Sequence, residues 1–198
     1  HDRSETMASG IDIMLVLDLS WSMMALDMSG PKERVTRFDV AAEVMQDFIR
    51  KRPSDRIGLL VFSAVPYLAS PLTLNHDWLA ENLHRLHVGM IREVGTAIGD
   101  ATAAAARRLK SATGRSRIII LLTDGDNNKG DIDPVPAAQL AAALGAKVYT
   151  IGIGIDQPCN LPEFEPSTGK LRSMPPAMSF PGSCCSRRIT PCSAGCPR

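Results

Sequence analysis

The chain has 198 residues, of which 44% are hydrophobic and 22% charged, and its formal net charge is +1. This composition is typical of a globular protein, and the length is enough for one well-packed domain with an additional segment. Basic and acidic residues are well mixed, so no binding face for nucleic acid or for an anionic membrane surface is predicted. The longest apolar run, residues 118–122, is far shorter than the roughly 20 residues of a membrane-spanning helix, so we expect a soluble fragment.

Apolar runs and helical patterns alternate along the first three quarters of the chain. Buried strands are predicted over residues 11–17, 56–63, 116–124 and 147–154, because each is a nearly continuous apolar run. Another strand is predicted from Tyr67, and the nearby Pro66 and Pro71 restrict it to a sheet edge. Helices are predicted over residues 33–51, 77–86, 97–109 and 136–144, from apolar spacings of three and four or from alanine-rich composition.

This alternation predicts a doubly wound α/β fold, in which a mostly parallel sheet has helices on both faces. We predict an N-terminal flank over residues 1–9, a domain core over 10–155, a proline-rich excursion of the same domain over 156–175 and an irregular tail over 176–198. The tail contains four of the five cysteines and resembles nothing earlier in the chain, so the C-terminal part is expected to be truncated or atypical.

Small oxygen-bearing side chains follow three of the predicted elements. Asp18, Ser20 and Ser22 end the first strand, Thr96 follows a glycine before an alanine-rich helix, and Asp124 ends the strand that begins at residue 116. In doubly wound sheets, ligands bind beyond the carboxyl ends of the strands. Magnesium prefers hydroxyls and water with one or two carboxylates, so these five residues predict a Mg²⁺ site, with Mn²⁺ or Ca²⁺ as alternatives. A carboxylate from a partner could complete the coordination.

The spacing D-x-S-x-S at residues 18–22, followed by Thr96 and Asp124, resembles the metal-ion-dependent adhesion site of von Willebrand factor type A domains. Stretches such as "RIGLLVFS" and "IIILLTDGDNNKGDIDP" resemble the bacterial Bat (aerotolerance) subfamily, and the resemblance extends over residues 10–175. It implies a Rossmann-like fold with one antiparallel edge strand. It also implies direct ligation by Ser20, Ser22 and Thr96, with an Asp18 oxygen near the metal and Asp124 acting through water.

The same resemblance implies a protein-binding module without turnover. The ligand would be a protein that donates a Glu or Asp carboxylate, and the parent protein would be anchored in the inner membrane with this domain in the periplasm. Other Bat proteins and a MoxR-type ATPase are the implied assembly partners. No contact with nucleic acid, and none between this fragment and the membrane, is expected.

Several interpretations remain open from the residues alone. Trp21 is either an aromatic anchor for a partner or packing at the rim of the site, and Asp126 could orient a metal-bound water or contact a partner. The alternative function is a magnesium-dependent phosphotransferase with Asp18 as nucleophile. Against it, Ser20 stands where such enzymes need a second carboxylate. His84 and His87 are three residues apart but lack further zinc ligands, which favours a surface position or packing between helices.

Overall fold

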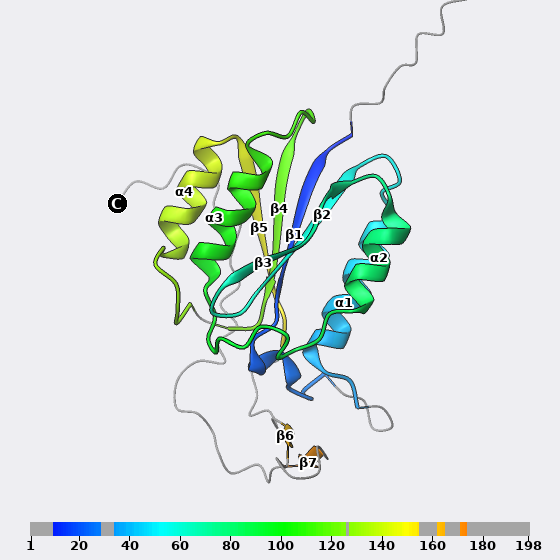
Figure 1. Ribbon diagram of the computed structural model, residues 1–198, viewed down its shortest axis with the longest axis vertical. Coiled ribbons are helices and arrows are strands. Elements are labelled where there is room, and N and C mark those ends of the chain that lie inside the picture. Colours follow the sequence, from blue (N-terminus) through cyan, green and yellow to red (C-terminus); the bar gives the residue numbers. More distant parts are fainter. Residues whose placement is uncertain (1–9, 29–33, 126, 155–161, 165–170, 174–198) are drawn as a thin grey trace, which may run out of the picture.

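Five strands form one sheet with helices on both sides (Figure 1). The structure is a computed structural model, and it describes residues 10–28, 34–125, 127–154, 162–164 and 171–173. The strand order is β3 (Pro66–Thr73), β2 (Arg56–Phe62), β1 (Asp12–Asp18), β4 (Arg117–Thr123) and β5 (Ala146–Gly152). Neighbouring strands are parallel except for the antiparallel pair β2 and β3. The predicted fold class, including the antiparallel edge strand, is therefore confirmed.

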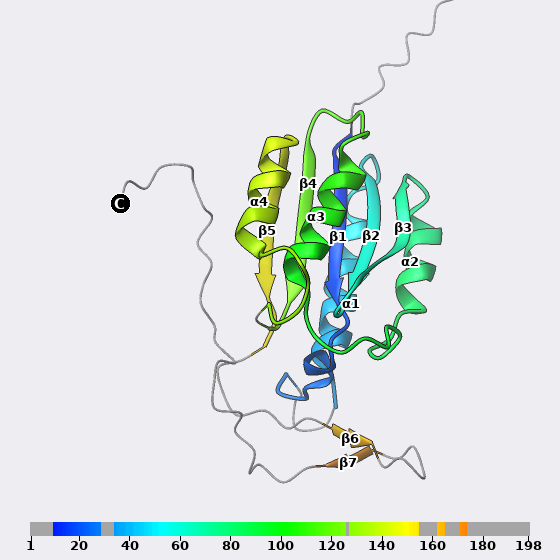
Figure 2. The same cartoon turned by 60° about the vertical axis from the view of Figure 1, so that its left-hand side comes forward.

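The two faces of the sheet bury separate apolar clusters. On one face, α1 (Arg37–Arg50) and α2 (His76–His84) pack against Ile13, Leu15 and Leu17 of β1. On the other face, α3 (Ile98–Leu109) and α4 (Pro134–Ala143) pack against Met14 and Val16 (Figure 2). All seven residues of β1 are buried, as expected for a central strand covered on both faces.

Local capping chemistry determines where the helices begin. Thr36 and Asp39 form a capping box, in which each side chain accepts a hydrogen bond from the other residue's backbone N–H, so α1 starts at Arg37. The predicted helix began four residues earlier. Helix α4 begins at Pro134, two residues before its predicted start, because proline lacks an N–H group and is well suited to the first turn.

One short strand pair lies in the proline-rich segment. Strand β6 (Pro162–Phe164) pairs in antiparallel fashion with β7 (Leu171–Ser173). Sequence analysis predicted no strand in this segment. Pro162 occupies the first position of β6, where proline is tolerated. The predicted flank 1–9 and tail 176–198 lie outside the described residues.

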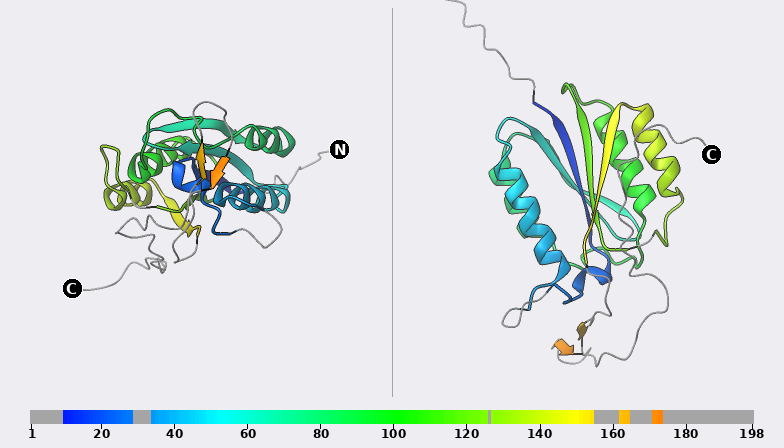
Figure 3. Two further views of the ribbon diagram at one scale, coloured as in Figure 1. Left: turned by 90° about the horizontal axis from the view of Figure 1, so that it is seen from below. Right: turned by 180° about the vertical axis from the view of Figure 1, so that it is seen from behind.

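Strand β5 leaves apolar side chains exposed on the α1 side of the sheet. Tyr149 and Ile151 are 49% and 43% exposed, and their register partners on β4 are Ile120 and Leu122. Among the helices that the structure describes, none crosses in front of β5 when the molecule is seen from behind (Figure 3, right). Within the described residues, this flank of the sheet is uncovered.

Candidate metal centre

The carboxyl ends of β1 and β4 meet at one edge of the sheet, where the 3-10 helix η1 (Trp21–Met24) also lies (Figures 1 and 3). Asp18 is the last residue of β1, and its side chain is fully buried. Its Oδ1 accepts a hydrogen bond from the backbone N–H of Ser20 at 2.8 Å, and its Oδ2 accepts one from the hydroxyl of Thr123 at 2.6 Å. These bonds fix the carboxylate between the two strand ends.

The two serines connect this carboxylate to Asp124. The hydroxyl oxygens of Ser20 and Ser22 are 2.9 Å apart, and the Ser22 hydroxyl donates to Asp124 Oδ1 at 2.7 Å. The turn of η1, closed by a bond from Met23 N–H to the Ser20 carbonyl at 3.0 Å, brings the serines together. The intervening Leu19 is buried in the core. Four of the five predicted ligands are thus brought together.

Thr96 reaches the same edge through the loop before α3. Its N–H donates to Asn128 Oδ1 at 2.8 Å, and its carbonyl accepts from the N–H groups of Asn128 and Lys129 at 3.0 and 3.2 Å. The Thr96 hydroxyl is 4.0 Å from the position that a Cβ on Gly125 would occupy, which places it beside the residue after Asp124. Sequence analysis did not identify Asn128, although the asparagine pair after "TDGD" is a signal for a loop that hydrogen-bonds to its surroundings.

The donor chemistry of this site fits a hard cation. It consists of carboxylate and hydroxyl oxygens, which magnesium, manganese and calcium all accept. Within the described ranges there is no group of three or more His, Cys, Asp or Glu residues that could hold a metal. His84 is exposed, and its Nε2 lies 2.8 Å from Nε2 of Gln46 on α1.

Asp18 differs electrostatically from the other buried carboxylates. Burial raises its pKa from 3.8 to about 6, and the charge of Asp124 acts in the same direction, while the hydrogen bonds from Thr123 and Ser20 lower it. The buried Asp124 and Asp27 are paired with Arg37, whereas Asp18 forms no salt bridge with any residue that the structure describes. A buried negative charge with only neutral donors around it favours a bound cation.

Arg37 is the main residue that sequence analysis missed. It is 1% exposed, its Nη1 donates to Asp124 Oδ2 at 2.7 Å, and its Nε and Nη2 donate to the Asp27 carboxylate at 2.6 to 3.0 Å. The predicted helix start at residue 33 placed Arg37 beyond the first turn. With the observed start at Arg37, the arginine is a cation in the first turn, where it opposes the helix dipole.

The two partner-contact candidates have different outcomes. Trp21 is 48% exposed, and its ring atoms Cζ2 and Cη2 would lie 3.5 Å from a Cβ on Gly89, so the ring lies beside the loop that follows α2. Asp126 lies outside the described residues. The nearby Asp100 accepts hydrogen bonds from the N–H groups of Asp131 and Ile132 and therefore stabilises the loop before α4.

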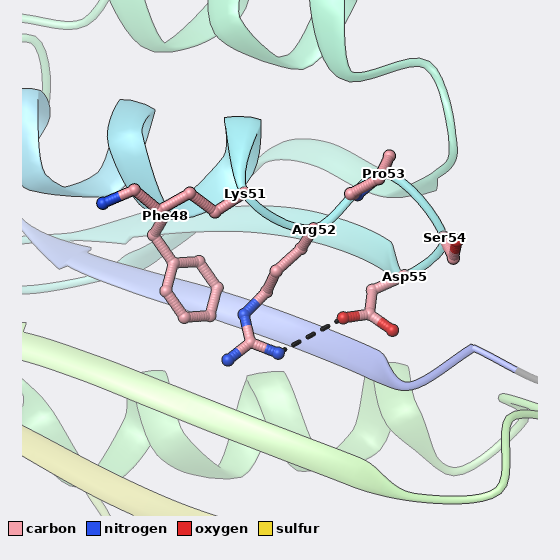
Figure 4. Close-up of a pocket in the computed structure, with 6 residues that line it drawn as sticks. All are labelled: Phe48, Lys51, Arg52, Pro53, Ser54 and Asp55. Carbon is pink, nitrogen blue, oxygen red and sulfur yellow. Dashed lines mark hydrogen bonds and ion pairs between the residues drawn. The ribbon is translucent and has the colours of Figure 1, made fainter.

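An open hollow lies at the other end of α1, close to the start of β2 (Figure 4). The Arg52 guanidinium is 4.5 Å from the centroid of the Phe48 ring and pairs with Asp55 at 3.3 Å. Because parallel strands begin at this edge and end at the opposite one, the hollow is remote from Asp18. It contains none of the predicted ligands.

Comparisons with known proteins agree with the fold described above. A family model described as von Willebrand factor type A domain matches residues 13–127. The chain is similar to the crystal structure of a conserved hypothetical protein, BatB, from Bacteroides thetaiotaomicron, with a TM-score of 0.71, 29% identity and coverage of 82% of this chain and 75% of that one. It is also similar to an aerotolerance-related membrane protein from Bacteroides fragilis, with a TM-score of 0.68, 28% identity and coverage of 83% and 81%.

A curated relative is an uncharacterized protein of Borreliella burgdorferi, which is 32% identical over 165 residues, or 83% of this chain and 47% of that protein. The chain spans about half the length of the curated relatives it matches. Within the described residues, no helix combines the length and apolar character needed to cross a membrane.

Proposed function

Because the chain belongs to the von Willebrand factor type A domain family, and within it to the Bat subfamily, we propose that it is a metal-dependent protein-binding module. Ser20, Ser22 and Thr96 would ligate a Mg²⁺ ion through their hydroxyls, with Asp18 close to the ion and Asp124 acting through water. An acidic side chain of a protein partner would complete the shell. When bound, the ion supplies the positive charge that attracts this carboxylate.

The observation that carries the proposal is the uncompensated charge of Asp18 beside a continuous chain of oxygen atoms. Its carboxylate is buried, has a raised pKa and accepts hydrogen bonds only from neutral groups, while Ser20, Ser22 and Asp124 continue the oxygen chain from it. Asp124, the other carboxylate among the described residues of the site, is already paired with Arg37. A divalent cation at this point would compensate the charge and gain ligands that are already positioned.

The proposed setting of the module is based on its similarity to Bat proteins. We propose a parent protein anchored in the inner membrane, with this domain on the periplasmic side and in contact with other Bat proteins and a MoxR-type ATPase. The similarity to an aerotolerance-related membrane protein supports the membrane association. Trp21, half-exposed beside the site, is the residue that we propose contacts the partner.

The phosphotransferase alternative is less well supported by the geometry. A nucleophilic carboxylate needs an oxygen directed at the substrate, but both oxygens of Asp18 accept short hydrogen bonds and the side chain is fully buried. This arrangement suits an anchoring carboxylate better than an attacking one. A phosphatase assay in excess magnesium separates the two functions, since turnover that is abolished by Asp18→Asn would support the enzyme.

The Ser20→Ala variant tests the module directly. We expect it to weaken Mn²⁺ and Mg²⁺ binding measured by calorimetry by at least tenfold, because one ligand is removed. Saturation of the wild type at about 100 times Kd should stabilise the fold by about 2.7 kcal/mol and raise its Tm by roughly 5 to 10 °C. Capture of a partner from detergent-solubilised membranes should require both magnesium and Ser20.

A matched control is available on β3. Ser70 is also fully buried, but its hydroxyl donates to the Pro71 carbonyl, remote from the site. Ser70→Ala should therefore lower stability without changing metal affinity. Equal metal affinity in wild type and Ser20→Ala, or no affinity in the wild type, would contradict the proposed function.

A further inference from the structure

We propose that Arg37 is a positioning residue of the metal site, which holds the Asp124 carboxylate in place and links it to two other loops. This inference rests on the proposed function, because the site that Arg37 positions is the proposed cation site. Arg37 does not itself offer a ligand, since a guanidinium has donors only. Its effect on metal binding would act entirely through Asp124.

The two oxygens of Asp124 have different partners. Oδ2 accepts from Arg37 Nη1 at 2.7 Å, and Oδ1 accepts from the Ser22 hydroxyl at 2.7 Å. The side chain of Asp124 is fully buried, so the carboxylate has no solvent to turn toward. Because the planar guanidinium holds one oxygen, the other is directed at Ser22 and hence at the proposed site.

The guanidinium is itself held from a second side. Nε and Nη2 of Arg37 donate to both oxygens of Asp27, on the segment between η1 and α1, and the Arg37 backbone N–H donates to the Ala25 carbonyl at 3.1 Å. The side chain of Asp27 is 2% exposed. A lysine could satisfy one of these carboxylates but could not form the fork that serves both.

Gly154 provides a third constraint. It adopts a left-handed conformation with φ of +120°, and a Cβ there would lie 2.8 Å from Arg37 Cζ and 3.0 Å from its Nε and Nη2. The preceding Ile153 is anchored to the end of β4 by a bond from its N–H to the Thr123 carbonyl at 3.0 Å. The guanidinium therefore lies directly against the backbone at the end of β5, where only glycine leaves enough space.

These contacts suggest a test by two variants that change no proposed ligand. Arg37→Lys keeps the charge but loses the fork, and Gly154→Ala keeps the arginine but displaces it. If Arg37 positions Asp124, each should weaken Mn²⁺ binding by about tenfold, the lower end of what loss of an outer-shell partner costs. The double variant should bind no more weakly than Arg37→Lys alone, because both changes act through the same contact.

Gly145→Ala is the matched control for backbone strain. Gly145 is also left-handed, with φ of +75°, but the nearest atom to its added Cβ would be Arg117 Nη1 at 3.8 Å. This variant should lose stability without losing Mn²⁺ affinity. All affinities are measured by calorimetry well below the unfolding midpoint of each variant, so that only folded protein is compared.

A second measurement does not depend on the metal. Hydrogen exchange in chelator should become faster over residues 18–25 and 121–125 in both Arg37→Lys and Gly154→Ala, and stay unchanged over 66–73 on β3. Unchanged Mn²⁺ affinity of the folded variants, with a lower Tm only, would overturn the inference and leave Arg37 a purely structural residue. If the wild type itself binds no Mn²⁺, the proposed function fails and the exchange result alone decides whether Arg37 positions the loops.

Discussion

Ionisation of Asp18 is expected to destabilise the metal-free fold, and Asp18→Asn tests this directly. Burial is the main cause that raises the pKa of this carboxyl from 3.8 to about 6. The folded chain therefore holds the Asp18 proton more tightly than the unfolded chain does. The resulting stabilisation is complete below pH about 3.8 and is lost as the pH rises through about 6. At pH 8 the metal-free protein carries the full penalty of a buried charge.

The penalty can be calculated from the pKa shift. The difference between 3.8 and about 6 is roughly two units, and at 1.36 kcal/mol per unit it corresponds to about 3 kcal/mol. Asn keeps the shape and the acceptor for the Ser20 N–H, and the Thr123 hydroxyl can rotate to accept from the new amide. We therefore expect Asp18→Asn to stabilise the chelated protein by about 2 to 3 kcal/mol at pH 8, or roughly 5 to 10 °C in Tm.

The assay is thermal and urea unfolding in chelator at pH 4, 6 and 8, in parallel with an Asp12→Asn control. Asp12 is equally buried at the other end of β1, but Arg56 pairs with it through two bonds of 2.6 and 2.7 Å, so loss of its charge should destabilise at pH 8. The advantage of Asp18→Asn should vanish near pH 4. At pH 8, Mg²⁺ at about 100 times Kd should cancel it, because only the wild type gains about 2.7 kcal/mol from the ion. An Asp18→Asn variant that is no more stable than wild type at pH 8, or whose advantage is independent of pH, would refute the reasoning.

Three further variants probe individual contacts. Thr36→Ala removes the capping box of α1 and should lower the unfolding free energy by about 1 kcal/mol in urea titrations. Gly99→Ala would place a Cβ 1.8 Å from the Ile132 carbonyl oxygen and should lower Tm far more than Gly152→Ala, where nothing lies within 4 Å; equal effects would contradict the contact. Trp21→Ala should reduce magnesium-dependent partner capture and leave Mn²⁺ affinity unchanged, whereas unchanged capture would indicate rim packing.

The fold could be predicted because its determinants are local. The apolar runs that became β1, β2, β4 and β5 are bounded by helices with their own periodicity, and this alternation allows few topologies. The two proposed carboxylates of the site could be predicted for the same reason. Asp18 is the last residue of β1, and Asp124 directly follows β4. Parallel strands bring their carboxyl ends to one edge, so residues far apart in sequence meet without any further information.

The supporting contacts could not be predicted, because they depend on tertiary placement. Arg37 and Asp124 are separated by 87 positions, and their pairing depends on where the first turn of α1 lies relative to the loop after β4. The bond between Thr96 and Asn128 joins two loops whose paths are set by the helices on either side. Propensity and periodicity carry no information about such pairs, which arise only when whole elements pack.

The two aspartates of β1 show how strand register separates a charge-paired carboxylate from one without a counter-charge. Both lie at the limits of the same apolar strand, and from sequence each is an acidic residue beside a hydrophobic run. Parallel pairing with β2 sets Asp12 opposite Arg56 but sets Asp18 opposite Phe62, so the part of the chain that the structure describes supplies a counter-charge to Asp12 and none to Asp18. A buried carboxylate that its own fold leaves without a cation must either take a proton or bind an ion. The register of a single strand pair therefore determines which end of β1 keeps a buried carboxylate without a counter-charge, and this is the end where we propose that the metal binds.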